Sequence, residues 1–238
     1  AVLENLIEEK RGVVPDTSWK KKYIGKNWYL GETLHAGIGQ GYWQTSPLQL
    51  CLMMSQIANG GYKIKPRIIL KKEEDRTFDN LKQFIQDKKI FSEDVVSLYD
   101  FISKFKYKSL FRNPENIKFV HDALFGATNE PRGTSYGSRL TKDKYIFAGK
   151  TGTSQVRRFT ERQRELEIKN EDLPYEQRDH ALFVAFAPYK DPRYAISVLV
   201  EHGGSGSKSA APIAKQVIKK VLEKHSLRES QRTFGETA

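Results

Sequence analysis

The sequence predicts an α+β fold in which helices pack against the strands of an antiparallel sheet. Three observations lead to this prediction. Helical patterns and loops fill the chain to about residue 134, strand-like apolar runs begin near residue 145, and an amphipathic helix follows them. With 238 residues, 38% of them hydrophobic, the chain is long enough for one sizeable domain or two small ones.

The first part of the chain predicts one loop, one buried helix and one short strand. Residues 12–41 are expected to be a loop, because they are rich in Gly, Lys and aromatic residues and lack periodicity. A helix should begin at Ser46, an N-cap followed by proline, and end before Gly60. Its residues are almost all apolar, which favours burial. Residues 62–70 resemble an edge strand interrupted by a proline.

Two further helices are expected before the sheet. Residues 71–89 are charged and should be irregular, after which Ser92 caps a helix with one apolar face. Another helix should run from Asn113 to about Ala127, and the loop 129–134 ends the helical part.

The second half of the chain predicts three strands. Residues 145–156 form the first, and residues 182–187 and 194–200 are apolar runs separated by a proline-rich segment of hairpin length. Residues 157–179 contain 13 charged side chains among 23 and should be a solvated loop outside the core. The amphipathic helix over 213–222 should pack against the sheet, and residues 226–238 should be a flexible tail.

The net charge of +11 allows three interpretations: a solvated basic surface, attraction to anionic lipid or glycan, or nucleic-acid binding. Nucleic acid is not expected, because no basic segment has interleaved aromatic residues. No apolar run approaches the roughly 20 residues that span a bilayer. Cys51 is alone, and the histidines lack metal-ligand spacing, so neither a disulfide nor a metal or other cofactor is expected.

One motif points to chemistry, the stretch AGKTGTS at residues 148–154. A phosphate-binding P-loop would need glycine at position 144, where this chain has Lys144, and a helix afterwards. The alternative is the Lys-Thr-Gly element of the serine β-lactamase and penicillin-binding group. In a strand, Lys150 and Gly152 lie on one face and Thr151 and Thr153 on the other. Such a strand offers a cation, hydroxyls and a backbone N–H to an acyl-transfer substrate.

Other stretches, in the same order, resemble the elongation-type class B penicillin-binding proteins of the penicillin-binding protein 2 group. The resemblance covers about residues 12–225, so residues 1–225 are identified as the C-terminal portion of a transpeptidase domain with a partial serine β-lactamase-like fold. The segments that carry it are VPDTSW at 14–19, KNWYLGET at 26–33, GIGQGYWQTSPLQL at 37–50, RGT at 132–134, AGKTGTSQV at 148–156, FVAFAP at 183–188 and EHGGSG at 201–206.

The nucleophile of that family lies in an S-x-x-K motif, and a second motif reads S-x-N; the second is absent here. Three serines have a lysine three residues on: Ser18, Ser103 and Ser205. None combines a nearby base with a desolvated setting, which an activated serine needs. The Gly-rich turn at Ser205 closes the fold in the family. We therefore expect the nucleophile upstream of residue 1, and no activity from this chain alone.

The resemblance implies a membrane-anchored, periplasmic D,D-transpeptidase that cross-links peptidoglycan stem peptides through a serine acyl-enzyme and is inhibited by β-lactams. Lys150 and Thr153 would be catalytic, and Thr151, Gly152 and Thr153 would bind substrate. Elongation-complex proteins are expected partners of the complete protein. The alternative is a non-catalytic basic module that binds an anionic polymer or a membrane.

Overall fold

The computed structural model of the chain describes residues 10–64, 66, 110–113, 115–156, 165 and 168–235. The predicted helix beginning at Ser92, the charged segment 71–89 and the pair Ser103 and Lys106 lie outside the described residues. Within the described ranges, no helix has the length and hydrophobicity needed to span a bilayer.

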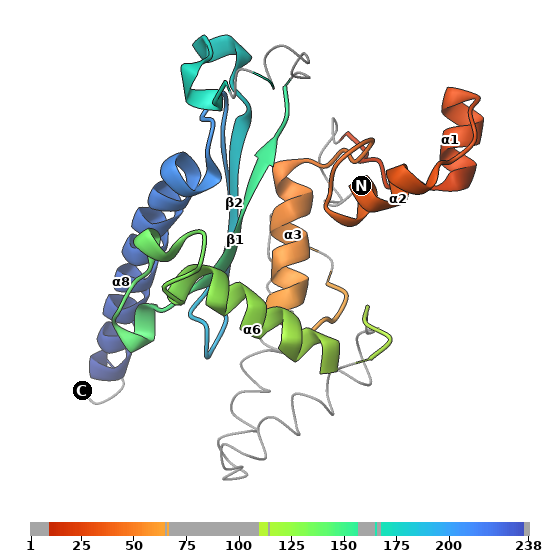
Figure 1. Cartoon of the computed structure of the whole chain (residues 1–238). Helices are drawn as coiled ribbons and strands as arrows, with labels where there is room; N and C mark the ends of the chain where they lie inside the picture. The colour runs from red at the N-terminus through yellow and green to blue at the C-terminus, as the bar shows by residue number, and fades with distance from the viewer. Residues whose placement is uncertain are drawn as a thin grey trace.

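A three-stranded antiparallel sheet forms the centre of the fold (Figure 1). Its strands are β1 (Ala148–Ser154), β2 (His180–Ala187) and β3 (Tyr194–Val200), in the order β1-β2-β3. The three predicted strands and the hairpin between the last two are confirmed. The first strand begins later than predicted, because Asp143–Tyr145 forms a 3-10 turn.

Helix α8 (Ala211–Gly235) covers one face of this sheet (Figure 1). Phe147 and Phe183 are fully buried there and pack against Ala214 and Ile218 of the helix. The predicted packing helix is confirmed and is longer than predicted, because α8 continues to Gly235; the flexibility expected for residues 226–238 stays a prediction.

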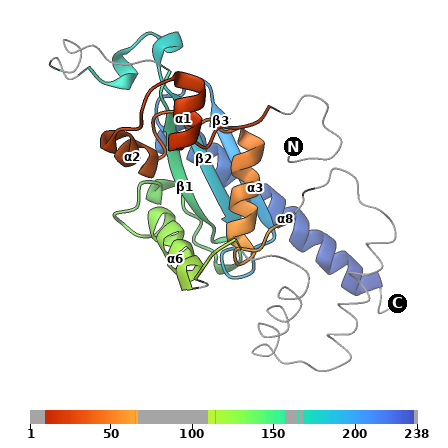
Figure 2. The ribbon, with the colours of Figure 1, turned by 90° about the vertical axis from the view of Figure 1, so that its right-hand side faces the viewer.

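Helices α3 (Pro47–Ala58) and α6 (Glu115–Asn129) cover the opposite face (Figure 2). Met54 of α3 and Leu124 of α6 pack with Val184 and Phe186 of β2. The predicted ends of both helices lie within a few residues of their ends in the structure. The capping box of α3 is formed as the sequence indicates, since Ser46 Oγ accepts from the Gln49 N–H at 3.2 Å. Full burial of α3 was overpredicted, because only Met54 is buried in it.

The prediction of a loop over residues 12–41 is wrong, because two short helices form there: α1 (Thr17–Ile24) and α2 (Leu30–Gly37). Asp16 caps α1 by accepting the Trp19 N–H at 2.6 Å, and Gly25 ends it in the left-handed region. A buried lysine joins the two helices: Lys20 Nζ contacts both carboxylate oxygens of Glu32 at 2.6 Å.

Two other segments differ from expectation. The described part of the charged segment 157–179 is not wholly solvated, because Leu173 and Asp179 are buried. Asp179 accepts hydrogen bonds from the Val156 N–H and the Asn170 side chain, which ties the segment to the end of β1. In the segment predicted as an edge strand over 62–70, the described residues 62–64 and 66 show an isolated bridge at Tyr62 and no strand.

Candidate active site

The free edge of β1 is hydrogen-bonded to α6 at the start of the strand and open further along it. At Gly149 the edge is closed, because Thr128 Oγ1 accepts from the Gly149 N–H at 3.1 Å and donates to the Gly149 carbonyl at 3.2 Å. Both backbone groups of Gly149 therefore point away from β2. Backbone direction alternates along a strand, so the N–H and C=O groups of Thr151 and Thr153 point to this same free edge.

The end of α6 holds the closed part of the edge in place. Thr128 and Ser135 are buried, and their hydroxyl oxygens lie 3.3 Å apart. Ser135 Oγ also donates to the Ala127 carbonyl at 3.0 Å, and the Asn129 side chain donates to the Phe147 carbonyl at 2.9 Å. Because these groups are paired and shielded from water, the start of β1 is fixed relative to α6.

Lys150 is exposed at the point where the edge opens. Its Nζ donates to the Thr151 carbonyl at 3.0 Å and lies 3.4 Å from Thr151 Oγ1. Lys150 is paired across the sheet with Val184, so its side chain leaves the sheet on the face that α3 and α6 cover. Among the described residues no carboxylate forms an ion pair with Lys150, so its charge is available to an anionic group.

A third hydroxyl, absent from the predicted site, joins this edge. Thr134 Oγ1 lies 3.2 Å from Thr151 Oγ1, and both side chains reach solvent. Gly133 makes this turn possible, because a Cβ at this position would lie 2.4 Å from the Gly126 carbonyl oxygen and 2.5 Å from that of Ala127. The Arg-Gly-Thr loop was recognised in the sequence, but nothing local indicated that its threonine meets the strand.

The glycines around Gly152 are explained by close packing. A Cβ on Gly152 would meet Leu182 Cβ at 3.2 Å. A Cβ on Gly206 would lie 2.5 Å from the Leu182 carbonyl oxygen and 2.7 Å from that of Gly152. The turn Gly206–Ala210, which leads into α8, therefore lies directly on the backbone of the two strands.

Neither described serine of the three S-x-x-K matches is arranged as a nucleophile. Ser205 Oγ is hydrogen-bonded to Ser207 Oγ at 3.0 Å, and Lys208 Nζ contacts the Glu171 carboxylate at 2.9 and 3.1 Å. Ser205 also lies where the chain enters α8, on the sheet face opposite to the Lys150 side chain. Ser18 is exposed in α1.

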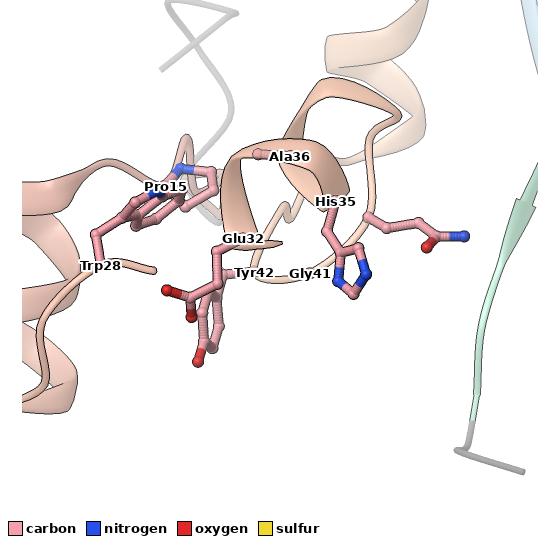
Figure 3. A pocket seen from close by; sticks show the side chains of 8 residues that line it. Pro15, Trp28, Glu32, His35, Ala36, Gly41 and Tyr42 are labelled. Carbon is pink, nitrogen blue, oxygen red and sulfur yellow. The ribbon is translucent and has the colours of Figure 1, made fainter. Parts of the chain in front are cut away.

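A separate cavity of about 250 Å³ lies beside α2 (Figure 3). The Lys20 hydrogen bonds hold the pKa of Glu32, which lines this cavity, below its usual range. The eight lining residues are Pro15, Trp28, Glu32, His35, Ala36, Gln40, Gly41 and Tyr42. The described residues contain no cluster of three or more potential metal ligands.

Residues 4–219 match the family described as the Penicillin binding protein transpeptidase domain. The chain belongs to this family. Family members similar to it include the protein named Peptidoglycan D,D-transpeptidase MrdA of Salmonella typhimurium, which is 33% identical over 92% of the chain and 32% of its own length. The protein of the same name in Escherichia coli K12 is 29% identical over 92% of the chain and 30% of its own length. The chain thus spans about a third of these relatives.

Solved structures of the family agree with the fold. The complex of PBP2 and MreC from Helicobacter pylori superposes with a TM-score of 0.66 at 27% identity, covering 91% of this chain and 32% of that one. Pseudomonas aeruginosa PBP2 in complex with WCK 5153 gives a TM-score of 0.63 at 30% identity, covering 91% and 39%. These matches confirm the predicted family and the α+β transpeptidase-like fold.

Proposed function

We propose that this chain forms one wall of the active site of a peptidoglycan D,D-transpeptidase that cross-links stem peptides during cell-wall elongation. The observation that carries the proposal is the free edge of β1, where Lys150, two threonine hydroxyls and outward-facing backbone groups meet. Membership of the transpeptidase family and the names of the relatives support the same reaction.

In the proposed reaction, a serine outside these 238 residues attacks the carbonyl carbon of a D-alanyl-D-alanine bond. The serine proton passes to a neighbouring base, an acyl-enzyme forms, and D-alanine leaves after taking up a proton. An amine of a second stem peptide then attacks the acyl-enzyme and releases the serine. Lys150 supplies positive potential and assists proton transfer, while Thr151 and Thr153 bind the terminal carboxylate of the substrate. Thr134 adds a hydroxyl beside Thr151.

The Thr153 N–H is the proposed protein donor to the oxyanion, with the serine N–H as the second donor. Its direction follows from the alternation fixed at Gly149, which makes the Thr153 backbone face the free edge and not β2. Gly152, whose own backbone is paired with β2, leaves the neighbouring strand surface without a side chain. A preorganised donor of this kind contributes about 10²–10³ in rate.

The same edge would bind β-lactams, which present a carboxylate and a strained acyl group to the serine. Because one similar structure is a PBP2–MreC complex, we also propose that the complete protein has an elongation-complex partner. We further propose that an anchor outside these residues attaches it to the periplasmic face of the inner membrane.

The first test is labelling of the full-length gene product with fluorescent penicillin. Lys150→Ala should slow acylation by about 10² or more, the range expected when a group that moves protons is removed. Lys142→Ala removes another exposed lysine and should label at the wild-type rate. An undiminished rate in Lys150→Ala would remove this residue from the mechanism. The 238-residue chain alone should form no adduct.

The second test separates the backbone of Thr153 from its side chain. Thr153→Pro deletes the N–H at an edge position, where proline costs no ladder hydrogen bond, whereas Thr153→Val keeps it. Acylation should fall by about 10²–10³ with proline beyond the effect of valine. Equal rates in the two variants, with matching circular dichroism, would contradict the oxyanion role.

A further inference from the structure

Two histidines lie together at the end of the sheet where β1 finishes. His180 is the first residue of β2 and pairs across the sheet with Ser154, the residue after Thr153. His202 follows β3, and the two imidazole rings meet edge to face with their centres 4.7 Å apart. Both side chains are half-buried. Neither of them takes part in the proposed reaction.

The hydrogen bonds of the two rings fix where their protons lie. His180 Nδ1 accepts from the His202 backbone N–H at 2.9 Å, so this nitrogen carries no proton. His202 Nδ1 lies 2.9 Å from the Arg178 carbonyl oxygen, which can only accept, so this nitrogen carries one. The two rings therefore respond differently to acid. His202 can take a proton at Nε2 and keep its bond, whereas a proton on His180 Nδ1 sets a donor against a donor and breaks the bond.

The bond to His180 helps to hold a strained turn, residues 201–206. His202 has a φ of 53°, and it is the one residue other than glycine with a left-handed φ in the part of the chain that the structure describes. The Tyr175 ring packs against His202 with centres 5.3 Å apart, and the Gly204 N–H donates to the Asp179 carbonyl at 2.8 Å. Strained backbone persists only where surrounding contacts fix it, so losing the His180 bond should loosen the turn.

The 201–206 turn ends on the backbone of the active-site strand. Gly206 packs so closely there that a Cβ on it would lie 2.7 Å from the Gly152 carbonyl oxygen and 3.1 Å from the Gly152 nitrogen. Gly152 directly precedes Thr153, whose N–H is the proposed donor to the oxyanion. Asp179, the neighbour of His180, also accepts from the Val156 N–H at 3.1 Å. Both the turn and the end of β1 therefore depend on the corner at His180.

We propose that His180 is a positioning residue for the active-site strand and that it acts only as the neutral imidazole, so that acid loosens the end of β1. The inference rests on the proposed function for the role of the Thr153 N–H. Imidazole is the side chain that ordinarily changes charge between pH 5 and 8, so the loosening belongs in this range. Acid would then slow acylation through the turn, without a change at Lys150 or at the nucleophile.

The surrounding charges permit a proton on His180. The ionisable groups around the pair are Glu171, Tyr175, Glu176, Arg178 and Asp179 before β2, Glu201 and Lys208 after β3, and Lys150 on the same face of β1. Lys208 is paired with Glu171, and Arg178 donates to backbone carbonyls. Nearby carboxylates favour the charged form of histidine, whereas a proton already on His202 opposes a second one on His180. The loosening should therefore come toward the acidic end of the range.

The pH dependence of acylation in the full-length gene product tests the proposal. His180→Asn places an amide oxygen near the position of Nδ1 and does not titrate, whereas His180→Phe keeps a ring and removes the acceptor. Between about pH 7.5 and about pH 5, labelling by fluorescent penicillin should slow about fivefold more in wild type than in His180→Asn, the effect of one hydrogen bond. His180→Phe should already be slowed about fivefold at the higher pH.

The matched control is His225→Asn. His225 is a half-buried histidine at the opposite end of β3, where its Nδ1 lies 2.7 Å from Tyr194 Oη. This variant should keep the pH dependence of wild type. The proposal is overturned if wild type and His180→Asn slow equally in acid, or if His180→Phe labels at the wild-type rate at the higher pH.

Amide hydrogen exchange, measured without penicillin, tests the structural step separately. After correction for intrinsic exchange rates, acid should open the 201–206 peptide of the wild-type full-length protein about fivefold more than that of His180→Asn. The peptide of α3 should keep its protection in both. Equal protection of the turn at both pH values in wild type would overturn the proposal. If the wild-type protein binds no penicillin, the proposed function fails, while exchange still decides whether His180 holds the turn.

Discussion

The sheet with its flanking helices and the α1–α2 segment are stabilised in different ways. In the sheet, Phe147 and Phe183 are fully buried between β-strands and α8. In the α1–α2 segment, the main internal contact is polar, the buried Lys20 bonded to Glu32, while the aliphatic side chains of α2 face outward. The sheet is thus stabilised by a buried apolar core, whereas α1 and α2 are joined by the Lys20–Glu32 ion pair together with local hydrogen bonds and ring contacts, and the aliphatic side chains of α2 remain exposed.

The largest expected effect is the loss of a core ring. Phe183→Ala should lower the free energy of unfolding of the 238-residue chain by about 3–5 kcal/mol, because it removes a fully buried aromatic side chain and leaves a cavity. Leu34→Ala in the same chain should change it by less than about 0.5 kcal/mol. Urea denaturation followed by circular dichroism measures both. Similar losses for the two variants would abolish the contrast between the regions.

An intermediate effect is expected where α6 closes the edge of β1. Thr128→Val keeps the shape of the side chain but leaves the Gly149 N–H and carbonyl without their partner. Each buried unpaired group costs about 1–3 kcal/mol. Amide hydrogen exchange at Gly149 should accelerate, whereas Thr134→Val, on the exposed loop, should leave it unchanged. Unaltered exchange in Thr128→Val would show that the hydrogen bonds between Thr128 and Gly149 are not needed to hold the strand.

The smallest effect concerns the α1–α2 ion pair and depends on pH. The Lys20 hydrogen bonds lower the pKa of Glu32 in the folded state. The stabilisation is therefore fully present above the ordinary glutamate pKa of about 4.3 and is lost as the pH falls through the lower folded value. The unfolding midpoint of Glu32→Gln should lie below that of wild type at pH 7 and approach it near pH 3.

A matched control for this pair is Glu171→Gln, which breaks the exposed pair with Lys208. Such exposed pairs contribute about 0.2–1 kcal/mol at most. If the unfolding midpoint of Glu171→Gln depended on pH as strongly as that of Glu32→Gln, the burial of Lys20 would add nothing to the stabilisation by its ion pair.

Sequence reasoning succeeded where local chemistry decides the structure. Ser46 and the following proline mark the start of α3, and the apolar runs of β2 and β3 need no further information. It failed for α1 and α2, because each helix has only eight residues and the one apolar repeat there, Leu30, Leu34 and Ile38, is too short to stand out among the Gly, Lys and aromatic residues around it. The caps were the usable evidence: Asp16 before α1, Gly25 after it, and Glu32 in the first turn of α2.

The candidate site divides in the same way. Lys150, Thr151 and Thr153 could be proposed from the sequence because they are consecutive or nearly so, and the strand in which they lie, with its register, is confirmed. Thr134 and Thr128 reach the strand from 17 and 21 residues away, through a turn whose geometry depends on tertiary contacts of Gly133. The α8 extension to Gly235 was missed because the apolar pattern weakens after Leu222.

The pairing of Thr128 with Gly149 also fixes where along the chain length changes are tolerated. A residue inserted in the exposed segment 141–142, before the 3-10 turn, would leave Gly149 opposite Thr128, and Lys150 would still emerge toward α3. A residue inserted directly after Gly149 would invert every later position of β1 and turn the lysine toward α8. The Thr128 hydroxyl group thus marks a boundary: the chain can vary in length before Gly149 but not in the part of β1 that follows it.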